Sequence, residues 1–575
     1  MKVKISSRSL LISYFLFFFI LTVVSFLITR IAPTGPFYTY NPTVFNLFFY
    51  MPPTIWAAIF GMGGLLIFLV FHDFKGLSPK FIYGLMLLSV LVIFAVFCGL
   101  PYLMEPNPRN GDSWVHGGTA NAILSTGHLN LSKFQYQSYP SSFLILSIQS
   151  AISGVNLTSL LHILPMAIVL VFFAALFVAI NEISKNPKIA IVSVLVFGLS
   201  TYYLQFNFAP SLFGWILLFL LIAMFAKTAQ ASTEFKLVSN KLSFTIILLL
   251  FIIGVITTHP VTQFSAIAIM FFLFIFRKKI WRSNYAFLFS LLLLTILIIT
   301  AWAMFFGFSY FSNVLIESRN AFETIVSNLS KSVVAQSFKG FTPFGVANLL
   351  LARRAIFILI PLAGLCGLIL MWKQQKTSKN FTFLLAILFA GLTEIPLTLF
   401  GVLPLERSIQ LAFIPLSVFS AYLICTKKKV GVTILIFLVL TIPINFAANY
   451  WNEPFTMTFN WEISSAKFAA NYFHGIVLAD YTESEIMNYY GNFSKVYNDY
   501  YAIGAPPDVF NQNFIAAHGI KLVCITQLDV LNQALEGYNL SPTFLENSTF
   551  DLVYNNGYST IQVNSAQTPQ LNINP

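Results

Sequence analysis

Repeated apolar runs of about 18 to 22 residues constrain the fold of this chain more than any other feature. A helical run of this length crosses the hydrocarbon core of a bilayer, because each residue adds about 1.5 Å. The composition agrees: 57% of the 575 residues are hydrophobic, 9% are charged, and the mean hydropathy is +0.78. The sequence therefore predicts an all-α polytopic membrane domain.

Thirteen spans are predicted, the first of them a retained span that follows Lys2, Lys4 and Arg8. This first run is too long for the apolar core of a cleaved signal peptide. The predicted spans lie near residues 10–30, 53–71, 81–103, 157–180, 188–204, 209–227, 242–258, 260–276, 285–306, 355–372, 380–400, 408–425 and 430–447.

The apolar segment from Pro140 to Gly154 is short for a crossing, and its treatment decides the topology. If it does not cross, 20 of the 29 Lys and Arg residues before position 448 face the cytoplasm; if it crosses, only 11 do. Cytoplasmic loops are normally the basic ones. We therefore expect an interfacial or re-entrant segment in a multi-pass protein of the cell membrane, with a cytoplasmic N-terminus and an extracytoplasmic C-terminal domain.

The net charge of +12 is unevenly distributed along the chain. Residues 1–447 hold 29 basic and 9 acidic side chains, whereas residues 448–575 hold 3 and 11. Because the basic residues form short clusters between spans, membrane topology explains them and no nucleic-acid partner is expected.

The residues after about Asn449 have the pattern of a separate small α/β domain. We expect helices at 461–473 and 482–491, a strand at 475–480, a helix and strand within 513–525, and two strands joined by a turn within 550–563. The expected organisation is a transmembrane domain over 1–447, with an outer loop at 104–156, and an extracytoplasmic α/β domain over 448–575. This tail has no G-x-G-x-x-G and no P-loop, so we interpret it as a binding or structural module.

The first outer loop contains a rare acidic residue, Asp112, in the stretch "RNGDSWVHGG". Asp112 and His116 are four residues apart and share a face if this stretch is helical. Arg109, Trp114 and Tyr139 lie in the same outer loop. The structural alternatives are an N-cap role for Asp112 and an interfacial role for His116.

Other polar residues lie at the outer ends of later spans. His259, in "TTHP", is either a helix cap in a tight turn or part of a site. Glu394 lies inside a predicted span, where a carboxylate is costly unless it has a function or a basic neighbour. Glu406 and Arg407 begin another span, and Arg407 is suited to bind a lipid phosphate, or a membrane headgroup as an anchor.

These ordered features resemble the GT-C class of membrane glycosyltransferases, in particular uncharacterised archaeal and other prokaryotic members. The resemblance rests on "GDSWVHGGTANAILSTGHL", "YQSYPSSFLILSIQSAISGVN", "LQFNFAPSLFGWILLFLLIAMF", "TTHPVTQF" and "ERSIQLAFIPLSVFSAYL". It implies a fold related to dolichyl-phosphate-mannose mannosyltransferases and oligosaccharyltransferases. It also implies that Asp112 is the catalytic carboxylate and that Arg407 contacts the donor phosphate.

The chain departs from the metal-dependent members of that class, because it lacks a D-x-D-like pair after Asp112 and a W-W-D-like tail motif. These departures favour a metal-free enzyme that transfers a single sugar, and the sequence requires no cofactor. Glu105, Glu394 and Glu406 leave a divalent metal site open as an alternative.

The expected function is therefore glycosyl transfer, by a hexosyltransferase, at the outer membrane face. The donor would be a polyprenyl-phosphate sugar in contact with membrane lipids, and the acceptor a lipid, glycan or protein. The predicted catalytic residues are Asp112, as general base, and His116; the predicted substrate-binding residues are Arg109, Trp114, Tyr139, His259, Glu394, Glu406 and Arg407. The alternatives are a non-catalytic transporter or flippase of a lipid-linked saccharide, and a structural membrane protein whose tail binds a partner.

Overall fold

The structure is a computed structural model that describes most of the chain. The described residues are 7–31, 51–105, 107–129, 138–200, 208–230, 241–281, 285–308, 312, 316, 347–396, 408–449, 458–473, 475–479, 481–491, 495–497, 519–526, 550–555 and 559–564.

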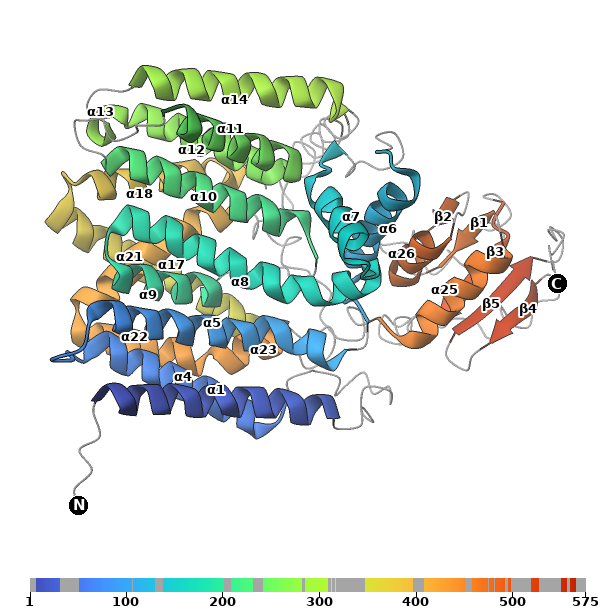
Figure 1. The fold of residues 1–575 in the computed structure, drawn as a ribbon, viewed down its shortest axis with the longest axis horizontal. Coiled ribbons are helices and arrows are strands. Elements are labelled where there is room, and N and C mark those ends of the chain that lie inside the picture. Colours follow the sequence, from blue (N-terminus) through green and yellow to red (C-terminus); the bar gives the residue numbers. More distant parts are fainter. Residues whose placement is uncertain are drawn as a thin grey trace, which may run out of the picture.

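Long apolar helices lie side by side and form a bundle, with α14 and α1 on opposite sides and the sheet-containing tail beyond one end (Figure 1). The bundle helices are α1 (Ser7–Ile31), α4 (Pro53–Phe71), α5 (Pro79–Met104), α8 (Leu157–Ser184), α9 (Pro187–Ser200), α10 (Pro210–Gln230), α11 (Lys241–Thr258), α12 (Pro260–Ile275), α14 (Tyr285–Phe305), α17 (Ala347–Gln375), α18 (Lys379–Leu392), α21 (Gln410–Thr426), α22 (Lys428–Leu440) and α23 (Ile442–Asn449); the four-residue α13 (Arg277–Ile280) follows α12.

The share of each helix that is buried by protein indicates its position in the bundle. Every residue of α9 from Ala190 to Ser200 is buried, so α9 is a central helix. By contrast, α1 leaves Phe17 and Leu10 each 61% exposed. A helix that is apolar on all sides and only partly covered by protein is suited to contact lipid.

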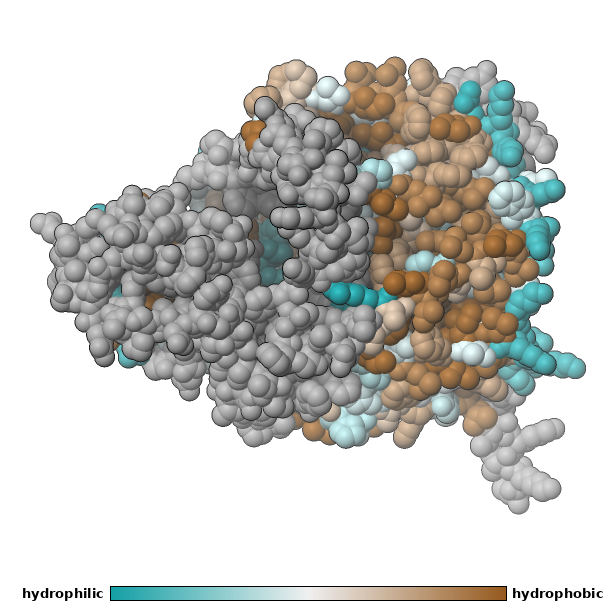
Figure 2. All heavy atoms as spheres, turned by 180° about the vertical axis from the view of Figure 1, so that it is seen from behind, coloured by the Kyte–Doolittle hydropathy of each residue, from teal (hydrophilic) through white to brown (hydrophobic). Residues whose placement is uncertain are grey.

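Eight described helices are long and apolar enough to cross a membrane. Five shorter apolar helices, α9, α11, α12, α18 and α21, coincide with further predicted spans. The bundle also exposes a broad apolar band between its two ends (Figure 2). The chain is thus a multi-pass membrane protein with the predicted all-α membrane domain, while the number of thirteen crossings stays a prediction.

Hydrophilic side chains gather at the end of the bundle that faces away from the tail (Figure 2). Two basic residues make contacts between helix ends: the Arg8 guanidinium lies 5.2 Å from the ring centroid of Phe81, and Lys379 Nζ donates a hydrogen bond to the Ala229 carbonyl at 3.3 Å. The first described helix, α1, begins at this end, and the strands of the tail lie beyond the other (Figure 1). This distribution has the form of the positive-inside pattern.

Two short helices, α6 (Gly111–Thr126) and α7 (Ser141–Ser153), pack together at the tail end of the bundle (Figure 1). Ser147 Oγ on α7 donates to the Ala120 carbonyl on α6 at 2.8 Å. The α7 helix ends at Gly154, which adopts a left-handed conformation with a φ of 69°. Its 13 residues span about 20 Å, less than the hydrocarbon core of a bilayer.

The tail contains a five-stranded sheet in the order β2-β1-β3-β5-β4. Its strands are β1 (Ile476–Leu478), β2 (Lys495–Tyr497), β3 (Leu522–Thr526), β4 (Phe550–Asn555) and β5 (Ser559–Asn564). β1 is parallel to β2 and β3, with Val477 opposite both Val496 and Leu522; β3 and β4 run antiparallel to β5. The helices α25 (Asn460–Tyr472) and α26 (Tyr481–Tyr490) pack beside this sheet.

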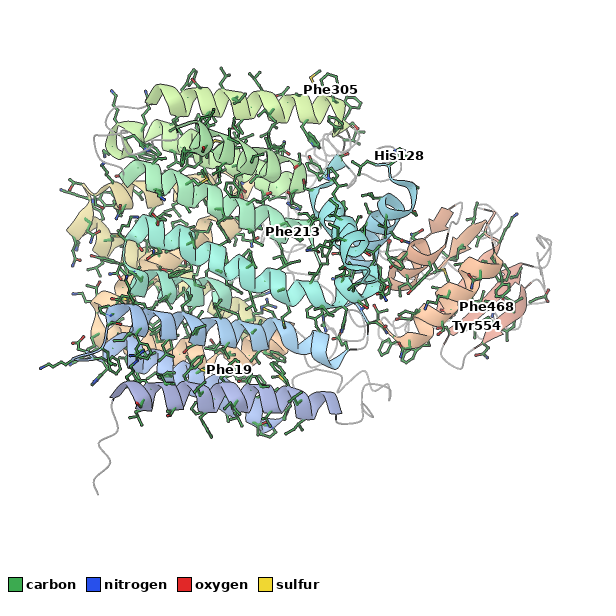
Figure 3. All side chains as sticks on the ribbon, viewed as in Figure 1. Phe19, His128, Phe213, Phe305, Phe468 and Tyr554 are labelled. Atoms are coloured by element: carbon green, nitrogen blue, oxygen red, sulfur yellow. The ribbon has the colours of Figure 1, made fainter. Side chains whose placement is uncertain are left out.

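The predicted small α/β domain is confirmed, and most of its expected elements are present. Phe468 on α25 stacks on Tyr554 of β4 at 4.6 Å between ring centroids, so this helix covers the sheet (Figure 3). The sequence did not predict β2. The helix expected before Gly519 and the turn between β4 and β5 lie outside the described residues. The domain boundary at residues 447 and 448 stays a prediction.

Candidate functional site

Asp112 lies in the first turn of α6, at the tail end of the bundle. The helix begins at Gly111, and its N-cap is Asn110, whose side-chain oxygen accepts the Asp112 backbone N–H at 3.3 Å. Asn110 has a φ of 71°, a left-handed conformation that Asn tolerates better than most residues do. The structural alternative for Asp112 was an N-cap role, and the structure gives that position to Asn110. The Asp112 side chain is half-buried.

Arg109, two residues before the helix, is buried and forms an ion pair with Glu105. Both side chains are nearly inaccessible to solvent, so each compensates the charge of the other. Arg109 was predicted from the sequence to bind substrate, and that role stays a prediction. Its guanidinium already has a carboxylate partner within the protein.

His116 follows Asp112 by about one turn of α6 and is buried. Its ring centroid lies 5.5 Å from that of Phe143 on α7 and 6.4 Å from that of Phe208. Burial in these surroundings lowers the pKa of His116 to about 4, and the nearby Asp112 charge opposes this shift. The imidazole is therefore neutral at pH 7.

Trp114, a predicted substrate-binding residue, is fully buried in the apolar core of the tail, with residues such as Ile486 and Met487. Its Nε1–H donates to Thr458 Oγ1 at 3.0 Å, and its ring centroid lies 5.2 Å from that of Tyr489 on α26. The indole thus joins α6 to the tail and is inaccessible to solvent in this structure.

The tail helix α26 packs directly against α6. A side chain at Gly118 would meet the Tyr489 Cα at 3.6 Å, so the two backbones approach closely. Asn121 Nδ2 donates to the Tyr489 carbonyl at 3.5 Å, and the Tyr489 hydroxyl lies 3.1 Å from Thr158 Oγ1 on α8. These contacts hold one tail helix beside the carboxylate-bearing helix.

The same tail helix carries a second carboxylate, Glu485, whose side chain is half-buried. Burial first, and then the Asp112 charge, raise the pKa of Glu485 to about 7, while a hydrogen bond with Asn488 opposes the shift. Glu485 is not among the site residues predicted from the sequence. Its only signal was a carboxylate on a predicted tail helix, and several other tail residues have that signal.

Tyr139 and His259 lie near the same end of the bundle, on neighbouring elements. Tyr139, before α7, is fully buried. Next to it Ser141 shares a hydrogen bond of 2.6 Å with Thr257, two residues before His259. His259 is buried at the N-cap position of α12, where the turn-and-cap alternative placed it, and its side chain makes no capping hydrogen bond.

Glu394 is buried and accepts a hydrogen bond of 2.6 Å from Ser265 Oγ on α12. Sequence analysis placed Glu394 inside a helix over 380–400, but α18 ends at Leu392 and Glu394 lies in the turn that follows. Ser265 is six residues beyond His259, so Glu394 lies about 9 Å deeper along α12 than His259.

The structure therefore brings some of the predicted site residues together and separates others. Asp112 and His116 share α6, Tyr139 and His259 lie on adjoining elements, and Glu394 lies deeper in the bundle. Glu406 and Arg407 lie outside the described residues. Among the side chains that the structure describes, no group of three or more His, Cys, Asp or Glu residues is arranged to hold a metal ion.

Comparison with known proteins relates the fold of this chain to membrane transferases. No protein-family model matches the sequence, and no curated protein matches it. Among solved structures, the oligosaccharyltransferase AglB from Archaeoglobus fulgidus, in complex with an inhibitory peptide and a dolichol-phosphate, has a TM-score of 0.53 and 12% identity, over 84% of this chain and 75% of that one.

A second A. fulgidus oligosaccharyltransferase structure, tethered to an acceptor peptide with an NVT sequon, has a TM-score of 0.50 and 11% identity, over 84% of this chain and 74% of that one. ArnT from Cupriavidus metallidurans bound to undecaprenyl phosphate gives a TM-score of 0.43 at 9% identity, over 85% and 98% of the two chains, which is too low for a structural argument. The two stronger likenesses establish the fold. The chain has a GT-C-like fold, as the sequence resemblance predicted.

Proposed function

We propose that the protein is a membrane glycosyltransferase that moves a sugar from a polyprenyl-phosphate-linked donor to a lipid, glycan or protein acceptor at the outer membrane face. The observation that carries this proposal is the place of Asp112: a half-buried carboxylate in the first turn of α6, at the junction of a GT-C-like helical bundle with its tail. The A. fulgidus enzyme with this fold was solved with a dolichol-phosphate, which supports a donor of the same chemical class.

Asp112 is the general base of this proposal. It accepts the proton of the acceptor hydroxyl as the acceptor oxygen bonds to the sugar carbon C1; the bond from C1 to the phosphate oxygen breaks, and polyprenyl phosphate leaves. His116 is less suited to this role because it is buried between α6 and the rings of Phe143 and Phe208. Arg407 is proposed to stabilise the charge on the departing phosphate, since Arg109 is already paired with Glu105.

The decisive variant is Asp112→Asn, in purified protein reconstituted into liposomes. The probes are dolichyl-phosphate mannose and dolichyl-phosphate glucose, labelled in the sugar, and the measurement is the rate at which label leaves the donor. Because general-base catalysis contributes about 10²- to 10⁴-fold, we expect the variant to lose at least about 100-fold in rate.

Asp73→Asn is the matched control, since Asp73 is an exposed aspartate in the turn between α4 and α5. We expect it to behave as the wild type. Full activity of Asp112→Asn would reject Asp112 as the base. Movement of an intact lipid-linked saccharide across the bilayer, without cleavage of the donor, would favour a flippase.

A further inference from the structure

Several helix ends on the side of the bundle away from the tail meet one another. Trp281, just after α13, donates a hydrogen bond from its Nε1–H to Thr228 Oγ1 on α10 at 3.3 Å. Its ring centroid lies 6.3 Å from that of Phe383 on α18. Lys379 Nζ, at the start of α18, donates to the Ala229 carbonyl on α10 at 3.3 Å. The ends of α10, of α12 with α13, and of α18 therefore adjoin one another.

These helix ends form a surface of concentrated positive charge, which we name the basic corner. Its basic side chains are exposed or half-buried, and none of the described residues 221–230, 271–281 and 372–381 is acidic. Like charges on adjoining helix ends repel one another, so the surface favours the binding of an anion. The members of the basic corner are Lys227, Arg277, Lys278, Lys279, Lys376 and Lys379.

Helix dipoles balance only part of this charge. The C-termini of α10, α12 and α17 lie at the basic corner and each carries about half a negative charge, whereas the N-terminus of α18 carries about half a positive charge. The Arg277 guanidinium donates to the Phe274 carbonyl at 2.9 Å and so already interacts with one of these C-termini. The helix ends together supply a net charge of about −1, which leaves most of the positive charge for an external anion.

The apolar surface beside the basic corner indicates the kind of anion. Phe271 and Ile275 on α12 are exposed within two turns of the basic corner, and so are Ile369 and Trp372 on α17. The Trp372 ring centroid lies 6.5 Å from that of Phe381 on α18, so this indole adjoins the same helix end. Tryptophan is enriched at the level of lipid headgroups. A ligand with a charged head and apolar chains therefore matches both parts of this surface.

We propose that the basic corner binds the phosphate headgroup of an anionic membrane lipid, whose chains lie along the exposed apolar sides of α12 and α17. Ammonium and guanidinium groups bind phosphate through charge-assisted hydrogen bonds. The positive-inside pattern requires basic residues on this side of the membrane, but it does not require them to meet at one place. The site lies at the opposite end of the bundle from Asp112 and is independent of the proposed function.

The test is thermal unfolding of the purified, delipidated protein in detergent, with added phosphatidylglycerol or with phosphatidylcholine of the same acyl chains. Phosphatidylglycerol should raise the unfolding temperature in a saturable way, and the lipid concentration at half of the maximal rise measures the affinity. Phosphatidylcholine, which has no net charge, should give no saturable rise. Because 1 M salt shortens the Debye length to about 3 Å, it should weaken the effect of phosphatidylglycerol.

The decisive variant combines Lys227→Gln, Lys278→Gln and Lys279→Gln. All three side chains are exposed, so the fold should be retained. Each Lys or Arg near a headgroup adds about fivefold to the affinity, so this variant should need at least about tenfold more phosphatidylglycerol than the wild type. Arginine at the same three positions keeps the charge and should preserve the affinity.

The matched control removes the same number of charges elsewhere at this end of the bundle. It combines Lys427→Gln, Lys428→Gln and Lys429→Gln, in the exposed basic run between α21 and α22. We expect the control to need the same concentration of phosphatidylglycerol as the wild type, because it leaves the basic corner intact.

Three results would overturn the proposal. Equal losses of affinity in the two triple variants would show that charge spread over the whole end attracts the lipid. Equal stabilisation by the two lipids would show that the headgroup charge plays no part. Inorganic phosphate that protects as well as phosphatidylglycerol at the same concentration would show a site for a free anion and not for a lipid. None of these measurements requires sugar transfer, so they stand whatever Asp112→Asn does.

Discussion

Asp112 and His116 lie about one turn apart on α6, yet their surroundings differ. Asp112 is half-buried beside the tail, whereas His116 is buried among aromatic rings, and burial lowers the pKa of His116 to about 4. The neutral imidazole can hold its place in an apolar environment without a counter-charge. Because His116 is buried in its neutral form, we expect α6 to be sensitive to acid.

Acid should destabilise the protein through His116. The unfolded pKa of histidine is near 6.5 and the folded pKa is about 4, so the stabilisation is complete above pH 6.5 and is lost as pH falls toward 4. The loss amounts to about 3 kcal/mol. The unfolding temperature of His116→Gln should therefore fall less than that of the wild type between pH 6.5 and pH 4.

His128→Gln is the control for this measurement. His128 lies in an exposed position just beyond the end of α6 (Figure 3), and its replacement should leave the acid-induced loss unchanged. If His116→Gln loses as much stability in acid as the wild type does, His116 is not buried as the structure has it.

The candidate site could be predicted from the sequence only in part. The spacing of Asp112 and His116 was enough to place both on one helix, because that relation is local. Glu485 could not be found this way, since its helix α26 packs against α6 only in the folded chain. Trp114 was expected to bind substrate, but its neighbours Thr458 and Tyr489 come from the tail and leave it no open surface.

At the scale of helices, the bundle depends on small residues where two helices approach closely. On α17, a Cβ at Gly367 would overlap the backbone carbonyl of Phe419 on α21, and one at Gly364 would lie 2.8 Å from the Leu416 carbonyl oxygen. Ser420 Oγ on α21 also donates to the Ile360 carbonyl on α17 at 3.2 Å. Small residues permit such close approach in membrane bundles.

Gly367→Ala should therefore destabilise the bundle. The added methyl group meets backbone atoms that cannot move aside as a flexible side chain can, and overpacking of this kind costs about 1–3 kcal/mol. The measurement is the unfolding temperature in detergent. Gly64→Ala is the matched control, since a Cβ there meets nothing within 4 Å, and it should be neutral or stabilising by up to about 1 kcal/mol.

The sequence predicted helices better than it predicted their ends. Apolar runs placed α4, α8 and α12 within a few residues of their observed bounds, because burial in lipid or protein demands unbroken apolar stretches. The end of α18 at Leu392 was missed because the residues up to Phe400 remain largely apolar, so composition gave no stop signal. The strand β2 was missed because three residues show too short a pattern.

At the scale of the whole molecule, the two ends of the bundle differ: one is hydrophilic and the other adjoins the tail. Hydrophilic side chains gather at one end of the bundle, and the tail, whose composition is acidic, lies beyond the other (Figures 1 and 2). By the positive-inside rule, we propose that the basic end faces the cytoplasm, which places Asp112 and the tail outside.

Labelling of intact cells with a membrane-impermeant maleimide tests this orientation. Leu552→Cys, at a position 56% exposed on β4, should be labelled above the wild-type background. Lys427→Cys, at an exposed position between α21 and α22 at the basic end, should be labelled only after the cells are opened. The reverse result would place the candidate site in the cytosol and contradict the outer-face reaction.

Trp114 has one further consequence for how the molecule works. Its indole is part of the tail interior, while its backbone is part of the helix that carries Asp112 two residues earlier. Any movement of the tail away from α6 must therefore carry this helix with it or expose a large aromatic ring to water. Displacement of the tail is thus coupled to the position of Asp112.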